Sequence, residues 1–217
     1  MSNTQTTAQS QSGWNRAYQR LTPESAVLLL IDHQSGLVSC IRDLAPDEVR
    51  HNVVAFARAA RVLRVPVVLT STAPMMWGPT LPELTEALPG VENIERSVVN
   101  AWDELRVREA VTRTGRQKFL IGGVTTHVCL AFPAMSAVAD GYDVYALLDA
   151  SGTWNDLLQR TAIHQMRQAG VRITSGAAAF MEMLHDNASP IAGAFYAALD
   201  LPATRYILQI TQGSKSA

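Results

Sequence analysis

Stretches of consecutive apolar residues alternate along the chain with stretches whose apolar residues recur every three or four positions. The first kind is typical of strands that are buried on both faces, and the second is typical of helices with one buried face. Strands are predicted at 26–31, 65–71, 118–122, 143–148 and 171–174. Helices are predicted at 49–63, at 103–114, after Cys129 and at 155–169, with one or two closing helices, and a loop rich in Pro and Met is predicted at 73–95.

Strands that alternate with helices need long, right-handed crossovers, which place parallel strands in one sheet with helices on both sides. The sequence therefore predicts an α/β fold, a three-layer α-β-α sandwich with a mostly parallel, Rossmann-like central sheet. The 217 residues suffice for one such domain with short extensions. We expect a flexible arm at 1–20, whose start is rich in Ser, Thr and Gln, the domain at 21–200 and a C-terminal extension at 201–217.

Composition and charge favour a small-molecule partner. The formal net charge is -1 and no block of Lys or Arg occurs, which argues against nucleic acid or an anionic membrane as a partner. No apolar run approaches the roughly 18 residues that span a bilayer. Two cysteines are too few for a disulfide framework, and the first residues lack the basic and apolar parts of a signal peptide. We therefore expect a cytoplasmic protein.

Cys129 is the first candidate for chemistry, because it stands where a predicted strand passes into a predicted helix. Gly122 and Gly123 permit a sharp turn there, and the amides and dipole of a helix start favour thiolate over thiol. The same amides can hold an oxyanion. Asp32 follows the first strand, and the carboxyl ends of parallel strands share one edge, so we expect Asp32 and Cys129 to meet there. The alternative is that Cys129 is one more small buried apolar residue.

Other chemistries find little support. The sequence has no Walker motif, no dinucleotide-binding glycine turn and no nucleophile elbow around a serine. Its five histidines lack the spacing of zinc ligands, so we expect no metal and no cofactor. Cys40 has no base predicted beside it and is interpreted as structural.

The stretches 31–34, 100–103 and 122–133, which read Ile-Asp-His-Gln, Asn-Ala-Trp-Asp and Gly-Gly-Val-Thr-Thr-His-Val-Cys-Leu-Ala-Phe-Pro, resemble the isochorismatase-like cysteine hydrolases. The similarity is strongest to the metal-free YcaC-like branch of that family, and it extends from about residue 22 to 199. Members of this family carry an Asp, Lys and Cys triad. The resemblance implies that Asp32 accepts and donates the proton and that Cys129 is the nucleophile. It also implies a cis peptide bond between Val124 and Thr125, with the amides of Thr125 and Cys129 forming an oxyanion hole.

The third triad position departs from the family. Alignment places Arg96 where the family has lysine, and the sequence contains only Lys118 and Lys215. Lys118 begins the strand that leads to Cys129, so we expect it at the opposite end of the sheet. Arginine keeps its charge and can favour a thiolate, but it cannot plausibly transfer a proton. A surface or purely structural role for Arg96 remains the alternative.

Several residues are candidates for a substrate pocket. Met75, Met76, Trp77, Trp102 and Phe132 offer apolar walls, although such residues more often belong to a core or a subunit contact. Gln34, Asn100 and His127 complete the predicted pocket.

The hypothesis is a metal-free cysteine hydrolase that cleaves a small amide or related C–N bond through a Cys129 thioester. One alternative is a catalytically silent binding or redox-responsive scaffold of the same fold, and another is a vinyl-ether hydrolase of the isochorismate type. The resemblance also implies a homo-oligomer.

Overall fold

The structure is a computed structural model that describes residues 19–201 and 205–206. Most of the predicted arm at 1–20 and of the predicted extension at 201–217 lies outside the described residues. The described part contains one sheet of parallel strands in the order β3-β2-β1-β4-β5-β6. The strands are β1 (Ala26–Ile31), β2 (Val67–Thr72), β3 (Asn93–Arg96), β4 (Lys118–Gly123), β5 (Asp143–Leu147) and β6 (Arg172–Thr174).

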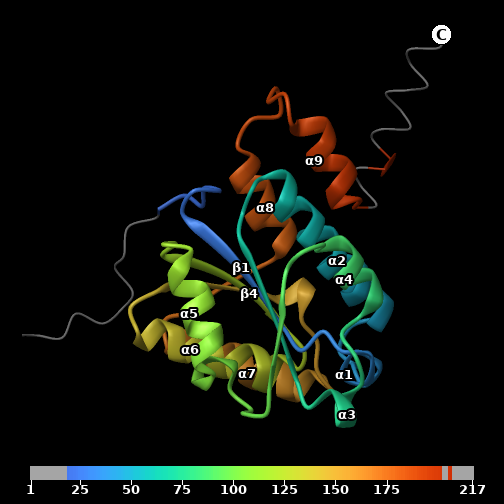
Figure 1. The fold of residues 1–217 in the computed structure, drawn as a ribbon, viewed down its shortest axis with the longest axis vertical. Coiled ribbons are helices and arrows are strands. Elements are labelled where there is room, and N and C mark those ends of the chain that lie inside the picture. The colour runs from blue at the N-terminus through green and yellow to red at the C-terminus, as the bar shows by residue number, and fades with distance from the viewer. Residues whose placement is uncertain (1–18, 202–204, 207–217) are drawn as a thin grey trace, which may run out of the picture.

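Helices cover both faces of this sheet (Figure 1). One face packs against α1 (Ser35–Ser39), α2 (Pro46–Val62), α4 (Pro82–Ala87), α8 (Gly176–Leu184) and α9 (Ala192–Leu199). The other face packs against α5 (Leu105–Arg113), α6 (Ala131–Ala139) and α7 (Asp156–Gln168). The predicted three-layer α-β-α sandwich is therefore confirmed. In the part of the chain that the structure describes, no helix has both the length and the apolarity to span a bilayer.

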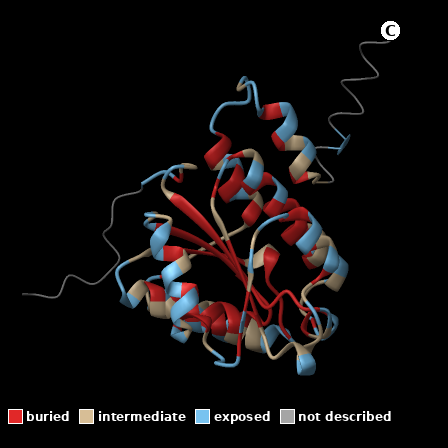
Figure 2. Cartoon of the chain, in the orientation of Figure 1, coloured by how far each residue is buried: buried red, intermediate tan, exposed pale blue. Residues whose placement is uncertain are grey.

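The central strand β1 explains the apolar runs of the sequence. All six of its residues are fully buried, and alternate side chains enter the two cores on either side of the sheet. Leu28 and Leu30 face the α2 side, whereas Leu29 and Ile31 face the α6 side. Because both faces are covered, neither set of positions can be polar. Figure 2 shows this buried centre between helices whose outer faces are exposed.

The predicted loop at 73–95 is the main error in the element prediction. It holds α3 (Pro74–Trp77), α4 and the edge strand β3. Pro74 and Pro82 stand at the first positions of the two helices. Proline has no amide hydrogen, but none is needed there, because an amide at the first position has no acceptor within the helix. The prolines of this segment are thus helix starts rather than loop residues.

Two helix starts also differ from the prediction. The helix predicted from Asp103 begins at Leu105, after the short 3-10 turn η1 (Ala101–Asp103), and Glu104 caps it through a bond from the Arg106 amide. The helix predicted around Cys129 begins with a single π-helical turn, η2 (Thr126–Leu130), in which the Leu130 amide donates to the Thr125 carbonyl at 3.2 Å.

The strand order reverses between β1 and β4. From β1 the chain continues toward β2 and β3 on one side, and from β4 it continues toward β5 and β6 on the other. The connections that leave neighbouring strands at such a point diverge, which is where open α/β sheets bind ligands. Asp32 follows β1 and Cys129 follows β4, so both flank this point.

Candidate active site

Asp32 is held at the end of β1 by the backbone. Its φ of 58° lies in the left-handed region, which aspartate tolerates better than most residues. Its amide donates to the Thr70 carbonyl at 2.9 Å, and its own carbonyl accepts from the Gln34 amide at 2.7 Å. The side chain is completely buried.

Arg96 ends β3 and reaches the same carboxylate. Its Nη2 donates to Oδ2 of Asp32 at 2.5 Å, and both side chains are fully buried. Its Nη1 donates to the carbonyls of Val98 and Val99, the latter at 3.0 Å. The guanidinium group therefore ties Asp32 to the loop that follows β3, because its two terminal nitrogens reach partners on opposite sides.

Cys129 lies on η2 and is 7% exposed. Pro133, four residues later, has no amide to donate to the Cys129 carbonyl, which agrees with a loosened turn before α6. Gly123 packs directly beneath this turn. A Cβ atom at Gly123 would lie 3.0 Å from the carbonyl carbon and oxygen of Cys129, so the close approach of strand and turn requires glycine here.

The segment between β4 and η2 contains a cis peptide bond between Val124 and Thr125. Three interactions fix this segment on either side of the cis bond. The Val124 amide donates to the Ile31 carbonyl at 3.1 Å, the Thr126 amide donates to the Gly152 carbonyl at 2.9 Å, and the Gly123 amide donates to Oγ of Ser151 at 3.0 Å. Thr125 is thereby held beside the turn that carries Cys129.

Ser151 and Gly152 are residues to which the sequence analysis assigned no role. Ser151 is fully buried, and its hydroxyl also donates to the Leu147 carbonyl at 2.8 Å. Val124 and Gly152 form an isolated parallel bridge. A small hydroxyl residue followed by glycine after a predicted strand was the available signal, but only the structure shows that the pair holds Val124–Thr125 in place.

Burial and mutual contact set the protonation of the site. Burial raises the pKa of Asp32 above its ordinary value, opposed by the Arg96 charge and by the Cys129 thiol. Oδ1 of Asp32 has no hydrogen-bond partner among the described residues, so it is free to accept a proton. Burial, and next the Asp32 carboxylate, raise the pKa of Cys129 well above its ordinary value, whereas the Thr125 amide and Arg96 act in the opposite direction.

The predicted lowering of the Cys129 pKa is therefore wrong. The helix-start amides do act as predicted, through Thr125, but the loss of water around the sulfur outweighs them. The thiol form of Cys129 beside the Asp32–Arg96 pair is the favoured resting state. A thiolate would form only as a proton passes to Asp32.

Three predicted pocket residues use their polar atoms within the fold instead. In the Gln34 side chain, Nε2 donates to the carbonyls of Thr72 and Gly78 at 3.0 and 2.6 Å, and Oε1 accepts from the Thr72 backbone amide at 2.9 Å. Asn100 caps η1 by accepting from the Trp102 amide at 3.1 Å. The Trp102 indole donates to Asp140 at 2.8 Å and packs in the core against the stacked rings of Phe119 and Tyr142. These contacts make Gln34, Asn100 and Trp102 structural residues, because no polar atom of theirs is left for a substrate.

The other predicted pocket residues lie nearer to solvent. Trp77 is half-buried and packs against the core on the α2 side. Phe132 is exposed on α6, and Met75 and Met76 are exposed on α3. His127 is half-buried; its Nδ1 lies 2.6 Å from Oγ1 of Thr153, and burial lowers its pKa.

Lys118 lies at the opposite end of β4 from Cys129, where its Nζ donates to the carbonyls of Gln19 and Arg20 at 2.9 and 2.6 Å. It therefore cannot take the place of the family lysine. Within the described ranges, no three His, Cys, Asp or Glu residues are grouped so that they could hold a metal ion.

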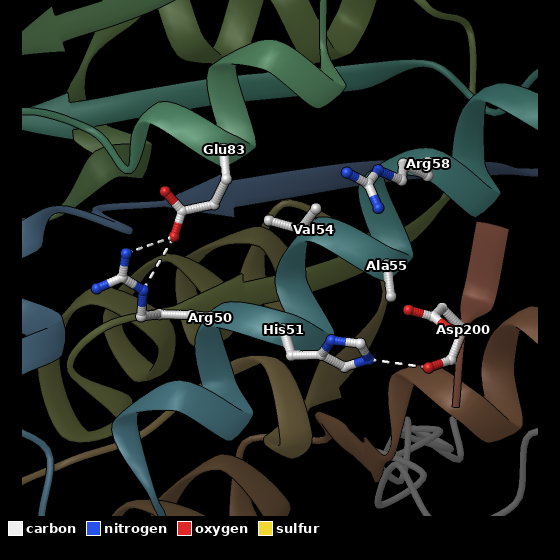
Figure 3. A pocket seen from close by; sticks show the side chains of 7 residues that line it. All are labelled: Arg50, His51, Val54, Ala55, Arg58, Glu83 and Asp200. Atoms are coloured by element: carbon white, nitrogen blue, oxygen red, sulfur yellow. Dashed lines mark hydrogen bonds and ion pairs between the residues drawn. The ribbon is translucent and has the colours of Figure 1, made fainter. Parts of the chain in front are cut away.

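A cavity of about 230 Å³ lies elsewhere, between α2, α4 and the end of α9 (Figure 3). Its polar groups are largely paired with one another. Arg50 donates to Glu83 at 2.7 and 2.9 Å, and Nε2 of His51 donates to the Asp200 carbonyl at 3.0 Å. The cavity lies on the α2 side of the sheet, whereas Cys129 packs on the α6 side, so it is not part of the candidate active site.

Comparison with known proteins identifies the family. Residues 26–178 match the family model described as the isochorismatase domain. The probable hydrolase YcaC of Escherichia coli is 38% identical over 182 residues, which cover 82% of this chain and 86% of the relative. Two solved structures superpose closely. YcaC from Pseudomonas aeruginosa, with hexane-2,5-diol and covalent acrylamide, has a TM-score of 0.85 at 38% identity and covers 91% of this chain and all of its own. The E. coli structure, described as an octameric hydrolase of unknown specificity, has a TM-score of 0.86 at 36% identity and covers 92% of this chain and 99% of its own. The chain belongs to the isochorismatase family and is a hydrolase of that family.

Proposed function

We propose that this protein is a metal-free cysteine hydrolase that cleaves a small amide or a related C–N bond through a thioester on Cys129. The observation that carries the proposal is that the Cys129 thiol and the Asp32 carboxyl, which Arg96 holds in place, are both buried beyond the ends of neighbouring strands, where each shifts the pKa of the other. A nucleophile beside a base that a third group orients is the arrangement that covalent catalysis needs.

The first half-reaction forms the thioester. Asp32 takes the thiol proton as the sulfur attacks the substrate carbonyl carbon, and the amides of Thr125 and Cys129 stabilise the negative charge on the carbonyl oxygen. The Thr125 amide acts to lower the pKa of Cys129, which supports this role. The C–N bond then breaks, and Asp32 returns its proton to the leaving nitrogen.

The second half-reaction releases the acid. Asp32 takes a proton from water, the hydroxyl group adds to the thioester carbon, and the C–S bond breaks. The proton on Asp32 then returns to the Cys129 sulfur, which restores the resting state. Arg96 stays charged throughout and stabilises the carboxylate, so every proton step passes through Asp32.

The relatives support a reactive site and an assembly. The P. aeruginosa relative holds covalent acrylamide, a compound that joins an amide to a carbon that thiolates attack. Acrylamide is therefore a suitable probe for Cys129. Since the E. coli relative is octameric, we propose that this chain also forms a homo-oligomer. We further propose that it acts in the cytoplasm, where its two unpaired cysteines would stay reduced.

The decisive experiment replaces each cysteine in turn. Release of ammonia or amine is measured over a panel of small amides, ureides and hydrazides. Cys129→Ala should lower kcat/KM by about a thousandfold or more, because the thioester cannot form. Cys40→Ala, which alters the exposed cysteine, is the matched control and should keep the wild-type rate. Mass spectrometry of acid-quenched enzyme should show the acyl group on Cys129. A Cys129→Ala enzyme with full activity would refute the mechanism.

One observation favours the silent scaffold as a second candidate. The pKa of Cys129 is raised, and no lysine that could carry a proton stands beside it. In that case no compound of the panel would be hydrolysed, and Cys129 would react with acrylamide no faster than an ordinary buried thiol.

A further inference from the structure

We propose that the site at Cys129 selects uncharged substrates and rejects those that carry a carboxylate near the scissile bond. This inference rests on the proposed function and narrows its substrate class to short, neutral amides with an apolar acyl group. The juxtaposition that carries it is the fully buried Asp32–Arg96 ion pair at an edge of the sheet whose connections carry mostly acidic and apolar side chains.

The charges inside the site are already matched. Asp32 and Arg96 are both fully buried, and the two Nη atoms of Arg96 are bonded to Asp32, Val98 and Val99. A substrate carboxylate would have to lose its water here without gaining a counter-ion of its own, which is strongly unfavourable. The buried Nε of Arg96 has no hydrogen-bond partner, but a carboxylate bound there would share the single Arg96 charge with Asp32, the residue that must accept the proton.

The connections that leave the carboxyl ends of the strands add mostly negative charge. We take these as residues 32–45, 73–81, 96–104, 124–130 and 148–155. They carry five acidic side chains, of which one is Asp32, and two arginines, Arg96 and Arg42. Such a balance repels anions as they approach the site.

The three remaining basic groups of these connections offer no built anion site. His33 is buried, and its Nε2 donates to the Ala150 carbonyl. His127 has a pKa that burial lowers, so its ring is neutral at pH 7, and Nδ1 is occupied by Thr153. Arg42 is exposed, and its Nη1 donates to the carbonyls of Ser39 and Ile41 at 2.8 and 2.6 Å. Arg42 is the single cation at this edge that a substrate anion could reach, and water screens it.

The same edge presents apolar side chains. Exposed examples are Met75, Met76, Val98, Val99, Phe132 and Trp154. Apolar surface favours the acyl group of a neutral amide and gives nothing to a carboxylate. The isochorismate alternative fits poorly for this reason, because that substrate class carries two carboxylates.

The test compares three amides of matched length at pH 7. Butyramide is neutral, succinamate ends in a carboxylate and 3-aminopropionamide ends in an ammonium group. The wild-type assembly, which includes any group that a neighbouring copy supplies, should show a kcat/KM for butyramide about 100-fold above that for either charged amide. Arg42→Gln, as the control, should leave this preference unchanged.

A second measurement does not depend on turnover. Cys129 in the Cys40→Ala variant is alkylated with iodoacetamide or with iodoacetate, and each rate is divided by the rate with a free thiol. The neutral reagent should be favoured by at least about tenfold. Equal labelling, or hydrolysis of succinamate as fast as butyramide, would overturn the inference while leaving the cysteine mechanism intact. A clear preference for iodoacetamide without hydrolysis of any amide would instead uphold the selectivity of the site and overturn the proposed function.

Discussion

At the scale of single residues, Arg96 shows what a sequence can and cannot tell. The sequence identifies an arginine where lysine is expected, and it leaves open a surface role for that arginine. The structure places the side chain in the interior, bonded both to Asp32 and to the carbonyls of Val98 and Val99. A lysine could not satisfy all of these partners, because its single nitrogen cannot occupy the positions of both terminal nitrogens of Arg96.

We therefore expect Arg96→Lys to lower kcat/KM by about 10- to 100-fold, the effect of losing one hydrogen bond to a charged group. Steady-state kinetics with the best amide of the panel would measure this. Arg64→Lys, at an exposed position, is the matched control and should have no effect. Higher activity in Arg96→Lys would show instead that arginine blocks a proton path that lysine restores.

His33 provides a test of stability against pH. Its Nε2 donates to the Ala150 carbonyl at 2.8 Å, and complete burial lowers its pKa from 6.5 to about 4. Between about pH 6.5 and about pH 4, His33 therefore carries a proton in the unfolded chain but not in the folded chain. As the pH falls through this window, His33 should remove about 3 kcal/mol from the free energy of unfolding.

Urea unfolding at several pH values would measure this loss. In His33→Gln the part of the stability loss that comes from His33 should vanish, because glutamine can still donate to Ala150 but does not titrate. Buried carboxyls such as Asp32 and Asp149, whose pKa values are raised, titrate in both proteins and cancel in the difference. Identical pH slopes for the two proteins would contradict the assignment.

At the scale of elements, the strands were easier to predict than the segments between them. The boundaries of β1 agree with the prediction and those of β4 differ by one residue, because a strand buried on both faces leaves an unbroken apolar run. The error at 73–95 arose because proline marks both loops and helix starts, and local sequence does not distinguish the two. The lowered pKa predicted for Cys129 failed for another reason, since burial of the sulfur is a tertiary property.

The passage from β4 to η2 depends on Gly123. In Gly123→Ala the new Cβ would press on the Cys129 backbone, which has little freedom to move. We expect a loss of about 1–3 kcal/mol in stability and at least a tenfold fall in kcat, because the sulfur shifts away from Asp32. Thermal unfolding and steady-state kinetics measure the two effects.

Gly193→Ala is the control for that substitution. Gly193 lies within α9, where nothing stands within 4 Å of a new Cβ, so alanine should be neutral or stabilise the helix. If Gly123→Ala proved as harmless as Gly193→Ala, the proposed need for close packing under Cys129 would be wrong.

At the scale of the whole molecule, the fold class followed from the alternation of elements, and the meeting of Asp32 with Cys129 followed from parallel strands sharing an edge. What the sequence could not provide was the set of contacts that occupies the polar atoms of Gln34, Asn100 and Trp102. Those residue types are equally suited to a pocket and to a structural network, and only their partners decide between the two.

The apolar edge also bears on assembly. Met76 is 73% exposed on α3, and burial of such side chains between copies is a common source of oligomer stability. We expect Met76→Glu to yield a smaller species in size-exclusion chromatography with light scattering. Ile191 is an exposed apolar residue directly before α9, and α9 and α3 lie at opposite ends of the view in Figure 1. Ile191→Glu should therefore keep the wild-type assembly. An unchanged mass for Met76→Glu would remove this surface from the proposed interface.

The reversal of strand order has one more consequence, which concerns how the gene could be divided. Asp32 and Arg96 both precede the exposed turn at Gly115, whereas Cys129 follows it, so an opening of the backbone there separates the proposed base from the proposed nucleophile without cutting any strand. Neither fragment would contain all three residues, and β1 of one fragment would have to pair with β4 of the other to bring them together. The protein is thus naturally suited to act as a complementation reporter, in which catalysis signals that two halves have found each other.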